Sequence, residues 1–347
     1  MVYRPLLSLD FFEKKVSNLL GWIHSLRALA AMAVIMIHIA GPNMYHHLFS
    51  GTWWMANGLD TISRFAVPLF LMISGALLLH KEEQLGVFAR KRAIKIAVPF
   101  LGWSLVYYVL AYGLNGTILG FGKEMIGTST HYHLWYFNLI IPLYFFIPLL
   151  RKVVAHIPVS YIWYYALVSA ALSTVTKMIS WMGGDLKVYE NPFSTGVAFL
   201  LLGYAITHRE MKIRYLNWAG TISIGVIFTG TYLLCFHDQA FNGILYDALG
   251  LFVMMQTVMI FAFVYQKQDA FNRIGQSMLI RLLSVHSFGI YLIHPIVIEF
   301  LMPFFPKAMF TLAYGYIGYV AFFITVLAGS FLSVWLMSKI PIIKMFV

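Results

Sequence analysis

Two side chains within one apolar stretch have the types and the spacing for chemistry inside a membrane. Arg27 and His38 are eleven residues apart in the run from Gly21 to Ala40, which has about the length that crosses a bilayer as a helix. Eleven residues at about 100° each bring His38 back to within about 20° of Arg27, roughly 16 Å further along the same helix face. A guanidinium that stays charged and an imidazole that transfers protons near neutral pH are costly to keep in hydrocarbon. We therefore interpret the pair as a functional site.

The elements that must position this pair are membrane helices. Of the 347 residues, 61% are hydrophobic and 11% are charged, and the mean hydropathy of +0.78 lies far above that of a soluble domain. The net charge is +11, but the basic residues are scattered between apolar runs, which argues against a nucleic-acid partner. Cys235 is the only cysteine, which excludes a disulfide framework and a thiolate metal site.

Ten apolar runs predict an all-α, polytopic membrane protein with about ten transmembrane helices. They lie near 21–41, 61–80, 93–114, 133–150, 159–177, 193–207, 217–236, 245–265, 284–303 and 310–338. We expect a single membrane domain over 21–338, preceded by an interfacial or flexible arm at 1–20 and followed by a tail at 339–347. Most of the 24 Lys and Arg residues fall in the arm, the tail and every second loop, so both termini are predicted to be cytoplasmic. The aromatic-rich segment 41–60 is predicted as a loop on the outer side.

Four further segments follow the Arg27–His38 stretch in order: 67–79, 88–100, 133–152 and 287–297. The first, VPLFLMISGALLL, contains Phe70, Ser74 and Gly75, and the second, FARKRAIKIAVPF, is a basic run that leads into the third span. The third opens on HLW and closes on PLLRK, and the fourth, SFGIYLIHPIV, contains a Tyr-Leu-x-His-Pro signature. With the Arg-to-His spacing, these segments resemble the acyltransferase-3 family of bacterial integral membrane proteins over about 270 residues.

The resemblance implies transfer of an acyl group, usually acetyl, in the bacterial cytoplasmic (inner) membrane. The donor is cytoplasmic acetyl-CoA, the acceptor is a hydroxyl of a cell-envelope glycan or a lipid-linked glycan, and no tightly bound cofactor is expected. The chain resembles the standalone members, which include an enzyme that acetylates the enterobacterial common antigen, so the membrane domain is expected to perform the whole reaction. The chain departs from the family pattern at three positions: His24 replaces a frequent Asp, Leu71 a Phe and Lys95 a frequent Arg.

In this family the positions of Arg27 and His38 are regarded as essential, and the chemistry of the two side chains agrees. A neutral imidazole is suited to take the proton of a hydroxyl, or it can accept the acyl group and pass it on, so His38 is predicted as a base or an acyl relay. Arg27 has no acidic residue within four positions. It is expected to face a polar cavity and bind a phosphate or polarise the thioester, with snorkelling to the cytoplasmic interface as the alternative.

Three cations at the start of the third span, Lys91, Arg92 and Lys95, are candidates for binding the phosphates of coenzyme A. Arg92 and Lys95 are three residues apart and so share a helical face. Anchoring to anionic lipid is an equally good interpretation of the cluster. Ser74, in the middle of the second span, is expected either to pack against a neighbouring helix or to contact substrate.

Aromatic and polar residues of the fourth and ninth spans are further candidates for the site. His133, Trp135 and Tyr136 form either part of the usual aromatic belt or a platform for a sugar ring. His294 is a candidate for substrate binding, and Glu299, five residues later, is a lower-ranked catalytic acid or base.

Two alternatives are weighed against this prediction. The pairs His46–His47 and His131–His133 lack the further ligands of a metal site, so no metal is expected. An exporter of a polysaccharide intermediate is the rival function, since many spans with buried charges suit a transporter. Two related halves with paired broken helices, which transporters often show, are not apparent in the sequence.

Overall fold

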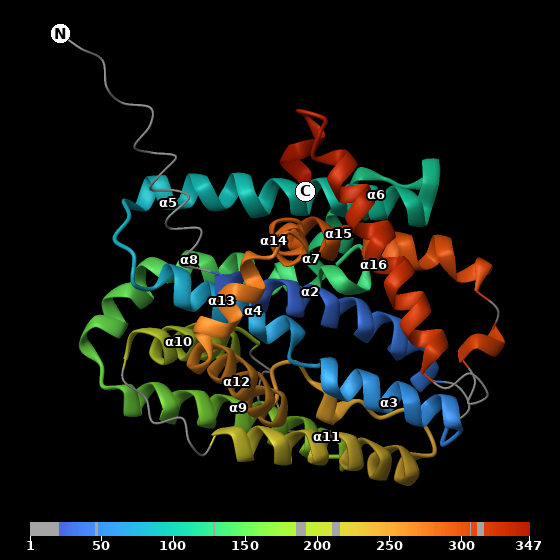
Figure 1. The fold of residues 1–347 in the computed structure, drawn as a ribbon, viewed down its shortest axis with the longest axis horizontal. Coiled ribbons are helices and arrows are strands. Elements are labelled where there is room, and N and C mark those ends of the chain that lie inside the picture. The colour runs from blue at the N-terminus through green and yellow to red at the C-terminus, as the bar shows by residue number, and fades with distance from the viewer. Residues whose placement is uncertain are drawn as a thin grey trace.

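A computed structural model of the chain describes residues 21–45, 48–127, 129–184, 192–209, 216–305, 307–310 and 316–347. These residues form helices and turns and contain no strand (Figure 1). Nine helical segments among them are long and apolar enough to cross a membrane, and α10 is a shorter apolar helix. The prediction of an all-α polytopic membrane protein is confirmed, with the predicted span at 193–207 forming that shorter helix. The arm at 1–20 and the pair His46–His47 lie outside the described residues.

The described α-helices, in chain order, are α2 (Gly21–Ala40), α3 (Gly51–Ser63), α4 (Ala66–Leu78), α5 (Leu85–Arg92), α6 (Val98–Tyr112), α7 (Ile118–Gly127), α8 (Trp135–His156), α9 (Val159–Trp181), α10 (Pro192–His208), α11 (Leu216–Asp238), α12 (Leu251–Gln266), α13 (Gln268–Gln276), α14 (Met278–Val285), α15 (Ser287–Leu301) and α16 (Ile317–Met337). A π-helical turn, η2 (Ala93–Ala97), joins α5 to α6, and a short 3-10 turn, η4 (Tyr132–Leu134), precedes α8.

The first helix, α2, is the central element of the fold. It contacts α3, α4, α12, α13, α14, α15 and α16 (Figure 1). Its alanines at positions 28, 30 and 31 are almost fully buried. Their small side chains allow the neighbouring helices to approach α2 closely, and these helices cover them. The helix that carries both Arg27 and His38 is therefore enclosed by protein along most of its length.

The second crossing differs from its prediction, because it begins earlier and is broken near its middle. It comprises α3 and α4, which together span Gly51–Leu78, whereas the sequence predicted a loop over 41–60. Ser50 caps the start of α3, because its hydroxyl accepts a hydrogen bond of 3.2 Å from the amide of Trp53. Its polar residues Asn57 and Asp60 are fully buried. Asp60 pairs with Arg64 at the break between the helices, so its charge has a partner inside the bundle.

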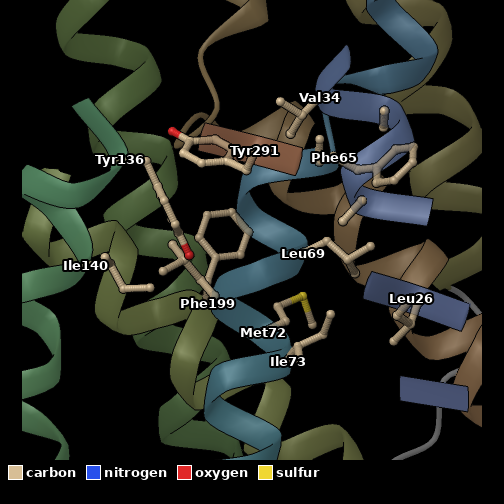
Figure 2. Close-up of a cluster of buried hydrophobic side chains, with 14 of the residues drawn as sticks. Leu26, Val34, Phe65, Leu69, Met72, Ile73, Tyr136, Ile140, Phe199 and Tyr291 are labelled. Atoms are coloured by element: carbon tan, nitrogen blue, oxygen red, sulfur yellow. The ribbon is translucent and has the colours of Figure 1, made fainter. Parts of the chain in front are cut away.

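Helix α4 packs closely against α10 through two glycines. A Cβ atom on Gly75 would lie 1.9 Å from the carbonyl oxygen of Leu200, and one on Gly203 would lie 2.0 Å from that of Met72. In the pair Ser74–Gly75, the glycine therefore serves the packing of α4 against α10. Figure 2 shows the buried side chains beside this contact, among them Leu69 and Met72 of α4.

Candidate active site

Arg27 lines a cavity of about 230 Å³ between α2, α4, α8, η2 and the α14–α15 region. The polar lining residues are Arg27, Ser74, Lys95, Tyr136, Tyr144, Ser284, Ser287 and Tyr291. Ile73, Tyr136, Ile140 and Tyr291 line the same cavity and also belong to the hydrophobic cluster shown in Figure 2. The cavity is therefore a partly polar space set directly against the core of the bundle.

Ser74 contributes to the wall of this cavity through a short chain of hydrogen bonds. Its hydroxyl donates to the carbonyl of Phe70 one turn earlier, at 2.9 Å. Because that donation uses its only proton, the hydroxyl of Tyr144 is the donor in their mutual bond of 2.9 Å. The bond joins α4 to α8 beside Arg27 and holds the Tyr144 ring in the cavity wall.

A second, larger cavity of about 620 Å³ lies at the end of α5 and is lined by Lys81, Glu82, Glu83, Gln84, Val87, Lys91, Arg92 and Lys95. Lys95 lines this basic vestibule and also the cavity of Arg27, so the two spaces meet at its side chain. The buried Nε atom of Arg92 has no hydrogen-bond partner among the described residues. The guanidinium of Arg92 lies over the rings of Phe88 and Tyr144, at 5.1 and 5.6 Å.

The three cations predicted as one cluster are not equivalent. The Nζ atom of Lys91 lies 2.5 Å from a carboxylate oxygen of Glu83, and Arg151 approaches the other oxygen at 3.7 Å. The hydrogen bond from Lys91, helped by the nearby charges of Arg92 and Arg151, lowers the pKa of the Glu83 carboxyl. Glu83 therefore stays ionised and paired with Lys91 throughout the neutral range.

His38 lies against a second histidine near the C-terminal end of α2. The Nε2 atom of His294 on α15 is 2.8 Å from the Nδ1 atom of His38, and the two rings are inclined by 28° with centroids 4.9 Å apart. His294 has no exposed surface. Its Nδ1 atom contacts two carbonyl oxygens of its own helix, those of Tyr291 at 2.7 Å and Ile290 at 3.2 Å.

Further histidines continue from this pair toward the end of α15. His133 is buried, with its ring centroid 5.5 Å from that of His294, and its Nδ1 atom is 2.8 Å from that of His131. His131 in turn lies 3.5 Å from the carboxylate of Glu299, which is 66% exposed. Glu299 therefore contacts His131 and not His38, which does not support the lower-ranked prediction that it acts on the reacting atoms.

Tyr291 separates the cavity of Arg27 from the histidines. Its side chain lines that cavity, and its hydroxyl donates a hydrogen bond to the backbone carbonyl of His133. The ring centroid of Tyr291 lies 6.0 Å from that of His294. His38 is not among the residues that line the cavity of Arg27, so this cavity does not reach both side chains.

The model of the acyltransferase domain family matches residues 20–339, more than nine-tenths of the chain. The chain belongs to the acyltransferase-3 family. It is thus a membrane acyltransferase, with its matched region covering every helix described above. No curated protein and no solved structure matches the chain.

In this acyltransferase the predicted site residues fall into two groups rather than one. Arg27, Ser74, Tyr136 and the three cations Lys91, Arg92 and Lys95 line the vestibule or the cavity of Arg27. His38, His133 and His294 meet at the other end of α2. Among the described residues, no group of three His, Cys, Asp or Glu side chains has an arrangement that holds a metal ion.

The predicted sugar platform is placed differently by the structure. Tyr136 is buried and lines the cavity of Arg27, and Trp135 is half-buried. The exposed ring is Tyr132, which the sequence interpretation missed. Its side chain is 54% exposed and its centroid lies 5.0 Å from that of His38. The sequence does place Tyr132 between His131 and His133, and this position could have marked it as a site candidate.

Proposed function

We propose that this acyltransferase moves an acetyl group from cytoplasmic acetyl-CoA to a hydroxyl of a cell-envelope glycan or a lipid-linked glycan in a bacterial cytoplasmic membrane. The observation that carries the proposal is the series of sites along α2. A basic vestibule meets the cavity of Arg27 at Lys95, and that cavity ends at Tyr291, whose ring lies beside His294 and so next to His38. Once Tyr291 moves, the donor reaches the imidazole of His38 from this cavity, on a route separate from that of the acceptor.

The donor end of this series suits a polyanion with a long arm. Coenzyme A carries a 3′-phosphate and a pyrophosphate. Among the vestibule cations, Arg92 and Lys95, like Lys81, have no carboxylate partner in the described contacts. Lys91 is held by Glu83 and contributes less charge to the site. With the phosphates in the vestibule, the pantetheine arm enters the cavity, where Arg27 is placed to bind the thioester carbonyl.

The chemical step needs a base for the acceptor hydroxyl. In direct transfer the imidazole of His38 takes the hydroxyl proton while the acceptor oxygen bonds to the acetyl carbon. The carbon–sulfur bond then breaks, and the leaving thiolate of coenzyme A takes the proton back from His38. In the relay alternative, an imidazole nitrogen of His38 bonds to the acetyl carbon, the carbon–sulfur bond breaks and coenzyme A leaves as its thiolate. The acceptor oxygen then bonds to the acetyl carbon, the carbon–nitrogen bond to His38 breaks, and the thiolate takes the hydroxyl proton. For either route Tyr291 must move so that the thioester reaches the imidazole.

The acceptor approaches from the opposite end, which the distribution of charged loops predicts to face outward. Tyr132 presents an exposed aromatic face next to His38, and such a face packs against the apolar side of a sugar ring. The exposed carboxylate of Glu299 lies on the same side through its contact with His131. Together they support a glycan acceptor, as in the standalone family members that the sequence resembles.

The test is acetyl transfer by the purified protein in liposomes. Radiolabelled acetyl-CoA is added with candidate glycolipids, and label in the lipid fraction is measured after chromatography. We expect transfer by the native protein and none by His38→Ala that retains its elution profile and thermal stability. Folded native protein that transfers no label to any candidate glycan, or equal transfer by the His38 variant, contradicts the proposal.

A further inference from the structure

The motif His294–Pro295 frees one backbone carbonyl and supplies its new partner. In an α-helix the amide at position 295 would donate to the carbonyl of residue 291, but proline has no amide hydrogen. The carbonyl of Tyr291 is thereby left without its usual donor in a buried part of the bundle. The Nδ1 atom of His294 lies 2.7 Å from that oxygen and takes the place of the missing amide.

This bond fixes which ring nitrogen of His294 carries the proton. A carbonyl oxygen only accepts hydrogen bonds, so the Nδ1 atom of His294 must be the donor. In a neutral imidazole the other nitrogen, Nε2, then has a lone pair and can only accept. His294 is fully buried, which disfavours a second proton on its ring.

The same logic passes to His38. The Nε2 atom of His294 lies 2.8 Å from the Nδ1 atom of His38, and two lone pairs facing each other at that distance would repel. One of the two atoms must donate, and His294 has no hydrogen there. His38 therefore carries its proton on Nδ1, and its Nε2 atom has the free lone pair.

We propose that His294, with Pro295, is a positioning residue that holds His38 in the Nδ1–H tautomer, so that Nε2 is the atom that takes the acceptor's proton or the acetyl group. Direct transfer and the acyl relay both need a lone pair on the ring nitrogen of His38 that meets the substrates. In the other tautomer of His38, that nitrogen carries the hydrogen and the lone pair on Nδ1 faces His294. When Nε2 gains a proton or an acetyl group, the Nδ1–H bond to His294 remains and stabilises the positive ring. The kinetic part of this inference rests on the proposed function, but the tautomer does not.

Two substitutions of His294 separate its two hydrogen bonds. The amide group of glutamine lies near the position of Nε2, so His294→Gln keeps an acceptor that faces His38. The amide group of asparagine lies near the position of Nδ1, so His294→Asn keeps the bond to the Tyr291 carbonyl and loses that acceptor. We expect His294→Gln to keep kcat within about fivefold and His294→Asn to lose about 10²-fold in kcat, with the KM for acetyl-CoA unchanged in both.

Equal kcat values for the Gln and Asn variants, or a loss confined to KM, would overturn the proposal. Both variants are first compared with the native protein for elution and thermal stability. A variant that fails to fold is replaced by the measurement below, which needs only the native protein and a reference in which His38 is removed.

The tautomer itself is read by nitrogen-15 NMR of histidine-labelled protein in lipid, with the His38 signals assigned by their loss in His38→Gln. We expect a hydrogen on Nδ1 and a bare Nε2 in the native protein. A hydrogen on Nε2 of His38 contradicts the inference whatever the activity. The expected tautomer in a protein that transfers no acetyl group would instead count against the proposed function and leave the inference standing.

Discussion

Arg27 and Lys95 line one cavity although they lie 68 residues apart on α2 and η2. None of the described residues that line this cavity is acidic. Two positive charges without a neutralising carboxylate, set in a space walled partly by apolar side chains, attract an anion or a carbonyl oxygen strongly. This arrangement argues against snorkelling as the reason for Arg27, since its guanidinium has an interior space to occupy.

The first prediction concerns the fixed charge of Arg27. Charge-assisted hydrogen bonds contribute about 1.5–3 kcal/mol each, so Arg27→Gln is expected to lower kcat/KM for acetyl-CoA by roughly 10- to 100-fold. Arg27→Lys should lie between the native protein and the Gln variant, because it keeps the charge and loses the planar fork. Initial rates at varied acetyl-CoA give these values. Native kinetics in the Gln variant would mean that Arg27 is only an interfacial anchor.

The second prediction separates two of the cations at the vestibule, Lys91 and Arg92. Because Glu83 already holds Lys91, Lys91→Gln should raise the KM for acetyl-CoA by no more than about twofold. Arg92→Gln is expected to raise it by about tenfold, since the buried Nε atom of Arg92 has no partner among the described residues. Lys91 is the matched control, being next in sequence and of the same charge. A larger effect at Lys91 than at Arg92 contradicts the assignment of the phosphate site.

The third prediction tests the contact between α4 and α10. Gly75→Ala places a Cβ atom 1.9 Å from a backbone oxygen, which a side-chain movement cannot relieve. We expect loss of folded protein or a large fall in melting temperature, and loss of activity with it. Gly225→Ala is the control, because it also lies within a helix and meets nothing within 4 Å. Thermal unfolding of the two variants in detergent decides the matter, and similar melting temperatures would refute the packing role.

Hydropathy and charge predicted most of the fold because they follow from the lipid solvent itself. Membrane helices must be apolar over a bilayer's thickness, so the run at 21–41 appears as α2, and the run at 245–265 appears as the segment Ile244–Gln266, which contains α12. The helix α3 was missed because its polar residues suggested an aqueous loop. Asn57 accepts a hydrogen bond from Tyr246, and a contact between such distant residues leaves no periodic signal in one sequence. Asp60 pairs with Arg64, four residues later.

The candidate site shows the same limit. The spacing of Arg27 and His38 predicted a common helix, which α2 confirms. It did not predict what lies between them, because Tyr291 comes from a helix more than 250 residues later. His294 and His38 are likewise 256 residues apart, and only the packing of α15 on α2 brings them together. The sequence shows that Pro295 has no amide hydrogen. It does not show that the Nδ1 atom of His294, and not Nε2, contacts the Tyr291 carbonyl that this leaves without a donor.

The last prediction concerns the acceptor side, where the exposed ring is Tyr132. Removing the ring in Tyr132→Ala is expected to raise the KM for the glycan acceptor by about tenfold, since stacking of an aromatic face contributes about 0.5–1.5 kcal/mol beyond the area it buries. The KM for acetyl-CoA should stay the same, because Tyr132 does not line the cavity of Arg27. Tyr132→Phe keeps the ring and should behave like the native protein.

Trp135 provides the control for this prediction, because it is an aromatic residue on the same segment but is half-buried and has no ring contact with His38 in the described structure. Trp135→Phe should leave both KM values within about twofold of native. Kinetics with varied acceptor at saturating acetyl-CoA separate the variants. If Tyr132→Ala changed the KM for acetyl-CoA and not that for the acceptor, the two substrates would have to approach His38 from the same side. The division of α2 into a donor end and an acceptor end would then be wrong.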